Sequence, residues 1–192
     1  MESNPKIILL FSGKRKSGKD FITDALFDRL NSNNAVIIKI SGPIKSYWAQ
    51  CNNLHLNDLL SDSLYKEKHR KQMIKWSEEQ RETDYGVFCR KAVELYRGSE
   101  KSVWIVSDVR RKTDILWFKE TYSIEKIKTI RINASKEKRK ERGWIFTLGI
   151  DDQPSECDLD DVNNWDWIFN NDGDASTLEQ FLVDITEFIN KI

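Results

Sequence analysis

Residues 13–20, GKRKSGKD, constrain the fold of this 192-residue chain more than any other segment. They follow a short apolar run, residues 7–11, which is typical of a buried strand. They lead into residues 18–30, whose apolar side chains recur at the spacing of an amphipathic helix. A strand, a glycine-rich turn and a helix in this order point backbone N–H groups and the positive end of a helix at one place. The sequence therefore predicts a phosphate-binding loop in an α/β fold.

The loop departs from the usual pattern at its last position. Residues 13–19 fit the start of G-x-x-x-x-G-K-[ST], in which Lys19 is expected to reach the β- and γ-phosphates of a nucleotide. Asp20 replaces the usual hydroxyl residue. Its carboxylate can hold Mg²⁺ directly or through water, and it is equally an ordinary acid of a first helical turn. A lysine-rich surface turn is the alternative for the whole segment, and the flanking strand and helix argue against it.

The rest of the chain alternates apolar strands with helices, which is typical of a parallel sheet covered on both faces. The further strands are expected at residues 36–40, 103–106, 126–132 and around 167–169. The further helices are expected from residue 41, over 54–97 in several pieces broken near 84–86, over 113–122 and over 176–189. Such sheets bind ligands at the carboxyl ends of their strands, so the chemistry is expected at residues 13–20, 41–45, 107–111, 133–135 and 170–173.

A second acid and two arginines end the apolar segment 103–108. Asp108 occupies the usual place of a second metal-supporting carboxylate, although a strand-end aspartate also caps helices. Arg110 and Arg111 follow at once, and guanidinium groups bind phosphate oxygens in a bidentate way. A solvated pair of arginines is the alternative, but the acid and the loop together favour a phosphate site.

Other cations lie in the helical region and near residue 140. Arg70 and Arg81 are eleven residues apart, so one continuous helix would put them on the same face. Lys45 follows a strand end, and Arg90 lies beyond the expected helix break. Each of these residues is as compatible with an idle surface charge as with a binding role.

The basic segment around residue 140 has two interpretations. Its lysines fit a solvated helix face, whereas Arg139 and Arg142, three residues apart, fit a lid that closes over a transferring phosphoryl group. The acidic stretch 151–156 that follows is expected to balance the lid electrostatically. Together, so many cations suit the meeting of two phosphorylated reactants, because phosphoryl transfer depends on positioning and on stabilising spread negative charge.

Composition narrows the class of protein. The net charge of zero argues against a general nucleic-acid binder. Three widely separated cysteines fit reduced thiols of a cytosolic protein, and no apolar stretch predicts a signal peptide or membrane span. The last three residues do not form a peroxisomal signal of the Ser-Lys-Leu type. We expect one domain over residues 1–192, in the cytosol, and a monomer, because no hydrophobic interface signal stands out.

Several long blocks closely resemble animal-type phosphomevalonate kinases, and the resemblance covers nearly the whole chain. The blocks are LLFSGKRKSGKD (9–20), SGPIK (41–45), YKEKHRKQMIKWSEEQR (65–81), FCRK (88–91), WIVSDVRR (104–111), RGWIFT (142–147) and DWIFNNDG (166–173). The loop aspartate belongs to the family's own pattern. The resemblance implies a nucleoside-monophosphate-kinase-like fold with five parallel strands, an acceptor region over about 43–97 and a lid over about 135–150. It also implies transfer of the ATP γ-phosphate to (R)-5-phosphomevalonate, giving 5-diphosphomevalonate and ADP in the mevalonate route to isoprenoids and sterols.

The resemblance also implies roles for individual residues. ATP would be bound by Gly13, Lys14, Arg15, Lys16, Ser17, Gly18, Lys19, Asp20, Arg139, Arg142 and Asp172. The acceptor would be bound by Lys45, Arg70, Arg81, Arg90, Arg110, Arg111 and Asn171. The residues expected to act in catalysis are Lys14, Lys19, Asp20, Arg110, Arg111 and Arg142, and those expected to hold Mg²⁺ are Asp20 and Asp108. Arg131 matches a further basic position of the family.

Two other functions remain as alternatives. A nucleoside monophosphate kinase shares the fold but needs a nucleobase pocket at the acceptor side, where this chain is rich in arginine. A nucleotide-dependent switch without transferase activity leaves the lid cations unexplained, and the sequence has no NKxD-type guanine signature. Turnover with a panel of acceptors distinguishes these classes.

Overall fold

A computed structural model describes residues 5–60 and 64–192 of the chain. In the described residues, five strands form one fully parallel sheet in the order β2-β3-β1-β4-β5. The strands are β1 (Ile7–Ser12), β2 (Ala35–Ile38), β3 (Val103–Val109), β4 (Ile127–Asn133) and β5 (Trp167–Asn170). The α/β class and the five parallel strands are therefore confirmed.

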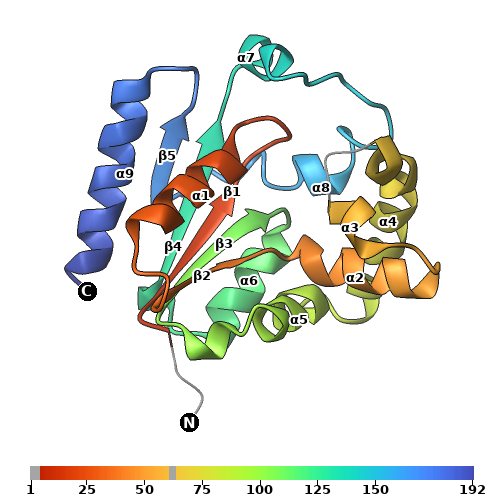
Figure 1. Cartoon of the computed structure of the whole chain (residues 1–192), viewed down its shortest axis with the longest axis horizontal. Coiled ribbons are helices and arrows are strands. Elements are labelled where there is room, and N and C mark those ends of the chain that lie inside the picture. The colour runs from red at the N-terminus through yellow and green to blue at the C-terminus, as the bar shows by residue number, and fades with distance from the viewer. Residues whose placement is uncertain (1–4, 61–63) are drawn as a thin grey trace.

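Helices cover both faces of this sheet (Figure 1). They are α1 (Lys19–Arg29), α2 (Ser41–Cys51), α3 (Leu56–Leu60), α4 (Leu64–Thr83), α5 (Val87–Leu95), α6 (Lys112–Thr121), α7 (Lys136–Glu141), α8 (Pro154–Cys157) and α9 (Ala175–Asn190). Two short 3₁₀ turns, η1 (Gly98–Glu100) and η2 (Ile124–Lys126), precede β3 and β4. Among the described residues, no helix is both long enough and apolar enough to cross a membrane.

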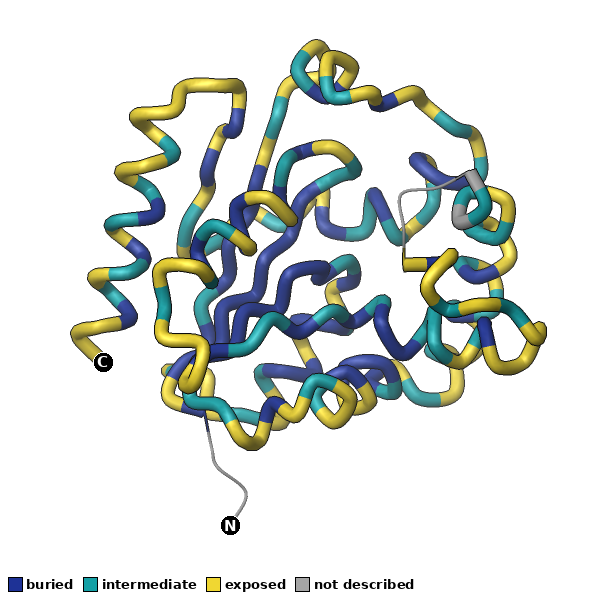
Figure 2. Tube along the Cα trace, in the orientation of Figure 1, coloured by how far each residue is buried: buried dark blue, intermediate teal, exposed yellow. Residues whose placement is uncertain are grey.

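The central strand β1 is buried on both faces, as its continuous apolar sequence predicts (Figure 2). Ile8 and Leu10 pack into a cluster with side chains of α5 and α6. Ile7, Leu9 and Phe11 face the other way, into a cluster with α1 and α9. Side chains alternate along a strand, so one strand belongs to both cores and fixes the position of the loop that follows it.

The ends of β3 and β2 differ most from the sequence prediction. β3 extends to Val109, beyond the apolar residues, so Asp108 lies inside the strand. β2 ends at Ile38, because the chain turns there into α2, whose first residue is Ser41. β3 extends because Val109 pairs with Ser12 of β1. The Asp108 carboxylate accepts hydrogen bonds from the backbone N–H groups of Ile40 at 2.6 Å and Ser41 at 3.0 Å, where α2 begins.

The helical region between β2 and β3 has the predicted break. Helix α4 ends at Thr83 and α5 begins at Val87. The turn needs Gly86, because a Cβ atom there would lie 2.1 Å from the Trp117 ring. Arg70 and Arg81 lie on the single helix α4, as expected.

Candidate active site

The loop between β1 and α1 requires glycine at both ends. A Cβ on Gly13 would lie 2.7 Å from the carbonyl oxygen of Ile132. Gly18 has φ +87°, and a Cβ there would lie 2.2 Å from Asn171 Nδ2. The side-chain amide of Asn171 donates to the carbonyl of Ser17 at 2.8 Å, so the loop after β5 supports the phosphate loop directly. Lys16, with φ +61°, is exposed at the tip.

Lys19 is buried, although it carries a charge. Its Nζ donates to the backbone carbonyl of Ser107 and lies 2.7 Å from Asp20 Oδ1. Asp20 is itself 68% exposed on its side chain. Burial acts to raise the pKa of Asp20, but the positive charges of Lys19, Lys39 and Arg110 outweigh it and hold this pKa below its usual value. Asp20 is therefore an ionised, accessible oxygen donor beside the loop.

Asp108 lies at the same edge of the sheet but is already engaged. Both of its carboxylate oxygens accept the backbone N–H groups that start α2. Next to it, the Ser107 hydroxyl is buried without a hydrogen-bond partner among the described residues, and so is that of Ser17 in the loop. Buried hydroxyls are normally bonded, so these two indicate a polar group that completes the site.

Three arginines near the end of β3 are each held by a carboxylate. Arg110 Nη1 donates to Glu156 at 2.5 Å, and Arg111 pairs with Glu78. Arg81 donates to Asp114 at 2.6 Å. Burial acts to lower the pKa of Arg110 and of Arg81, but the neighbouring carboxylates outweigh it and raise both.

Asp114 links this group together. Its other carboxylate oxygen accepts the backbone N–H groups of Arg110 and Arg111, both at 3.0 Å. It is fully buried, at the third position of α6. One carboxylate thus sets the path of the backbone that carries both arginines and also holds Arg81 from α4. Asp114 was not among the residues predicted from the sequence, where its only signal is an acid three residues into a helix.

The remaining acceptor-side candidates differ in how close they come to this group. Arg70 pairs with Glu67 at 2.8 Å and reaches to 3.9 Å of Glu156. Burial lowers the pKa of Arg70, and repulsion from Arg15 and Arg110 adds to this effect, although Glu67 opposes it. Lys45 is half-buried in the second turn of α2. Arg90 is 50% exposed on α5 and pairs with exposed Asp84, so it lies at the edge of the group.

The two lid arginines are held by backbone carbonyls instead. Arg139 Nε donates to the carbonyl of Arg15 at 2.7 Å, and its guanidinium lies 4.1 Å from the centre of the Trp144 ring. Arg142 donates to the carbonyls of Ser17 at 3.0 Å and Asn171 at 2.8 Å. The segment expected to be the lid therefore contacts the phosphate loop through both arginines.

Asp172, in the loop after β5, contacts the start of the segment expected to be the lid. Its carboxylate accepts the backbone N–H of Ser135 at 2.7 Å, just before α7. This hydrogen bond, though opposed by desolvation, lowers the pKa of Asp172. Arg131, on β4, donates to Ser12 Oγ at 2.9 Å and to Asp160 at 3.0 Å.

The acidic stretch 151–156 has more partners than the sequence predicts. Asp151 does bind the lid, because it accepts Trp144 Nε1 at 2.9 Å and the Thr147 N–H at 2.8 Å. It also accepts Arg15 Nη1 at 2.9 Å, and Asp160 accepts Lys14 Nζ at 2.5 Å. Asp151 therefore contacts both the expected lid and the phosphate loop, and Asp160, beyond the acidic stretch, also contacts the loop. The sequence does not predict these partners, because the two residues of each ion pair are more than 130 residues apart in the chain.

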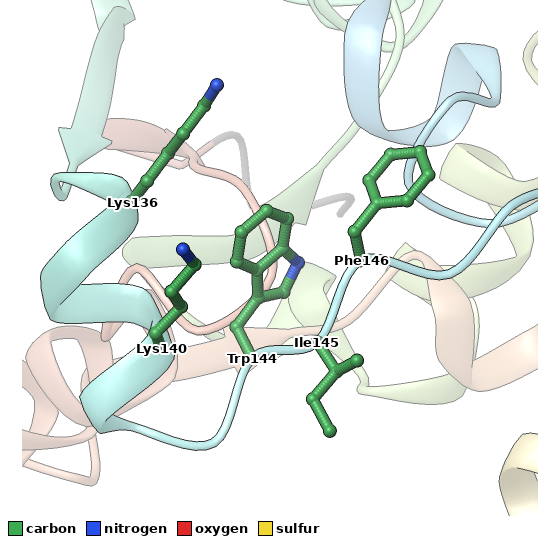
Figure 3. A pocket seen from close by; sticks show the side chains of 5 residues that line it. All are labelled: Lys136, Lys140, Trp144, Ile145 and Phe146. Atoms are coloured by element: carbon green, nitrogen blue, oxygen red, sulfur yellow. The ribbon is translucent and has the colours of Figure 1, made fainter.

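Two hollows lie near the loop and the lid. A polar cavity of about 280 Å³ borders the loop and is lined by Lys14, Ser17, Arg131, Ile132, Asn133, Ala134 and Asp160. A larger hollow of about 630 Å³ lies beside α7 (Figure 3). In this view Lys136 and Lys140 extend from α7, and Trp144 lies between Lys140 and Phe146. Both lysines are exposed, as expected for a solvated helix face.

Comparison with known proteins identifies the family. Residues 11–124 match the family model described as phosphomevalonate kinase. A Drosophila melanogaster protein named phosphomevalonate kinase is 51% identical over 180 residues, which is 93% of each chain. The chain belongs to the phosphomevalonate kinase family. The family match covers the loop, Asp108 and the acceptor-side arginines, and the relative extends it over the lid.

Solved structures of much lower identity share the fold. A gluconokinase from Sinorhizobium meliloti superposes with a TM-score of 0.51 at 10% identity, covering 98% of this chain and 96% of its own. The Thermus thermophilus protein TT1252 superposes with a TM-score of 0.53 at 16% identity, covering 96% and 97%. This chain therefore shares its fold with a protein named gluconokinase at low sequence identity.

Proposed function

We propose that this member of the phosphomevalonate kinase family transfers the γ-phosphate of ATP to (R)-5-phosphomevalonate, giving (R)-5-diphosphomevalonate and ADP in isoprenoid and sterol synthesis. One observation carries the proposal beyond the family match. The phosphate loop faces a second group of cations that comes from α4 and the end of β3, and both groups contact Glu156. A site with two cationic halves suits two phosphorylated reactants.

On the nucleotide side, the loop residues 13–20 bind the phosphates of ATP through their backbone N–H groups and through Lys14, Arg15, Lys16 and Lys19. Lys19, held by the carbonyl of Ser107, has an ammonium group ready for the transferring phosphoryl group. Arg139, Arg142 and Asp172 close the lid over the nucleotide. Among the described residues, the hydrogen bonds of the Arg142 side chain all go to backbone carbonyls.

On the acceptor side, Arg110 and Arg111 bind the phosphate of the acceptor and the transferring group. The other acceptor contacts are Lys45, Arg70, Arg81, Arg90 and Asn171. The attacking atom is a phosphate oxygen, which is already ionised at neutral pH, so no general base is needed. The site accelerates transfer by holding two repelling anions together and stabilising the charge that spreads in the transition state.

The oxygen donors present fit Mg²⁺. Among the described residues, no cluster of three or more acidic, histidine or cysteine side chains suits a tightly held metal. Mg²⁺ retains waters and uses phosphate oxygens, so accessible Asp20 is enough as a direct ligand. Asp108, whose oxygens are bonded to backbone N–H groups, would act through water. When bound, Mg²⁺ neutralises phosphate charge and orients the β- and γ-phosphates.

We also propose that the chain works as a single cytosolic domain. Its acceptor region is residues 43–97 and its lid is residues 135–150. It acts on a small-molecule substrate as a monomer, without nucleic acid or membrane.

Product analysis tests the proposed function. The chain is incubated with ATP, Mg²⁺ and 5-phosphomevalonate, and ³¹P NMR follows the acceptor. We expect the monophosphate resonance to be replaced by two coupled diphosphate resonances as ADP accumulates, and we expect EDTA to stop the reaction. ATP consumption without a new diphosphate would contradict the proposal.

A further inference from the structure

One buried carboxylate outside the expected site contacts both halves of it. Glu156 lies on α8, and its side chain is only 3% exposed. Its Oε2 accepts the backbone N–H of Arg15 in the phosphate loop at 3.0 Å. Its Oε1 accepts Arg110 Nη1 at 2.5 Å and lies 3.9 Å from Arg70 Nη2. The side chain thus joins the loop of the proposed nucleotide side to two arginines of the proposed acceptor side.

We propose that Glu156 is a positioning residue for phosphoryl transfer, which fixes the distance between the phosphate loop and Arg110. The inference rests on the proposed function. Glu156 does not touch the reacting atoms; it acts through Arg110 and through the loop backbone at Arg15. In-line transfer between two phosphates needs the two binding groups in a fixed relation, and small displacements reduce the rate strongly.

The local charges explain why a carboxylate is needed here. Arg15, Arg70 and Arg110 lie together in one partly buried region, so their positive charges repel one another. A buried carboxylate that is fully hydrogen-bonded stabilises such a group, whereas an unpaired one would be costly. Glu156 meets this condition, because both of its oxygens have a donor.

The geometry also leaves Arg110 able to bind substrate. Glu156 and the carbonyl of Ser155 use only Nη1 of the guanidinium. In the described part of the chain, no hydrogen bond or ion pair involves Nε or Nη2 of Arg110. One edge of the planar group is therefore anchored, and its remaining donors can bind phosphate oxygens.

The first experiment compares Glu156→Gln with a matched control. Asp161→Asn makes the same acid-to-amide change five residues further along the chain, at an exposed residue paired with exposed Lys112. With ATP and 5-phosphomevalonate, we expect kcat of Glu156→Gln to fall about 10²-fold, with KM of either substrate changed less than about fivefold. Asp161→Asn should match the wild type. A kcat of Glu156→Gln within about threefold of wild type would overturn the inference.

A second variant separates positioning from general structural support. Glu156→Gln is also made in the Arg110→Ala background, and the melting temperature of every variant is measured. If Glu156 acts through Arg110, the added loss in kcat should be less than about threefold there. An equal loss in both backgrounds, or a loss that tracks the unfolded fraction, would overturn the inference. If the wild type itself does not turn over 5-phosphomevalonate, the proposed function fails, and the inference that rests on it fails too.

Discussion

The arginines near the end of β3 and those of the lid are held by different partners. Arg81, Arg110 and Arg111 each pair with a carboxylate, whereas Arg139 and Arg142 donate to backbone carbonyls. A carboxylate fixes a guanidinium and offsets part of its positive charge. A backbone carbonyl also fixes the guanidinium but carries no negative charge to offset it. The arginines near the end of β3 are therefore anchored by ion pairs, whereas Arg139 and Arg142 are anchored by hydrogen bonds to the backbone and have carboxylates only nearby.

The largest effect is expected at the lid. Arg142→Ala removes a positive charge that we propose stabilises the nucleotide phosphates, so we expect kcat to fall about 10³-fold. Its partners are carbonyls that water can satisfy, so the melting temperature should change little. Lys140→Ala, at an exposed neighbour on α7, is the control and should leave kcat unchanged. Steady-state kinetics and thermal unfolding measure both, and a normal kcat for Arg142→Ala would remove the distinction between the two groups.

A slightly smaller effect is expected at Arg111. Arg111→Ala should lower kcat about 10²-fold, because one phosphate contact is lost in the transition state. Its partner Glu78 is 33% exposed, so water can solvate the freed carboxylate and stability should fall only modestly. The two quantities are measured on the same preparation. A large drop in melting temperature with normal specific activity would show that Arg111 is structural.

The acid that holds the acceptor side should matter most for stability. Asp114→Asn leaves Arg81 and two backbone N–H groups without their buried charged partner. We expect the free energy of unfolding to fall by about 3 kcal/mol, as for other broken buried pairs. Glu120→Gln, on the same helix at an exposed residue, is the matched control. Urea unfolding measures both; if the two variants are equally stable, carboxylate pairing does not organise this side of the site.

Much of this arrangement can be predicted from the sequence. What cannot be predicted depends on contacts between residues far apart in the chain. The alternation of apolar runs predicts all five strands, because each run is short and apolar, and the central strands β1 and β3 are buried along their whole length. The loop is predicted because two glycines and Lys19 have a fixed spacing. No sequence motif predicts the ion pairs of Glu156 with Arg110 and of Asp151 with Arg15. These pairs depend on how the segment around α8 packs against the rest of the fold.

The capping role of Asp108 shows the same limit. Its position at the end of an apolar run predicts an acid at the ligand edge of the sheet, which is where it lies. The sequence also raised capping as an alternative for this residue. The structure shows that Asp108 caps α2, a helix 67 residues earlier in the chain, and not the helix that follows it. Local sequence carries no information about that contact.

A moderate effect is expected at the margin of the acceptor group. Arg90 is half exposed and lies beyond the helix break, so Arg90→Ala should raise KM for 5-phosphomevalonate about tenfold and leave kcat nearly unchanged. Arg97→Ala, at an exposed arginine paired with Glu100, is the control. A kcat loss as large as that of Arg111→Ala would place Arg90 within the central group.

The smallest effect concerns a carboxylate outside both groups. Burial acts to raise the pKa of Asp166, but hydrogen bonds from Thr129 and the charge of Lys128 outweigh it and lower this pKa. Because the folded-state pKa is lowered, the stabilisation is complete above the unfolded value of about 3.9 and is lost as pH falls through the folded value. We expect Asp166→Asn to melt below wild type at pH 7 and the difference to shrink below about pH 4. A difference that is constant with pH would show that the charge of Asp166 is not responsible.

Release of ADP with a panel of acceptors tests the central claim that the carboxylate-balanced arginines bind a phosphorylated, non-nucleotide acceptor. The panel contains 5-phosphomevalonate, mevalonate, AMP, UMP, CMP and no acceptor, each with ATP and Mg²⁺. We predict turnover with 5-phosphomevalonate alone, because only it brings the acceptor phosphate without a nucleobase. Turnover with a nucleotide, or with mevalonate in place of its phosphate, would contradict the account.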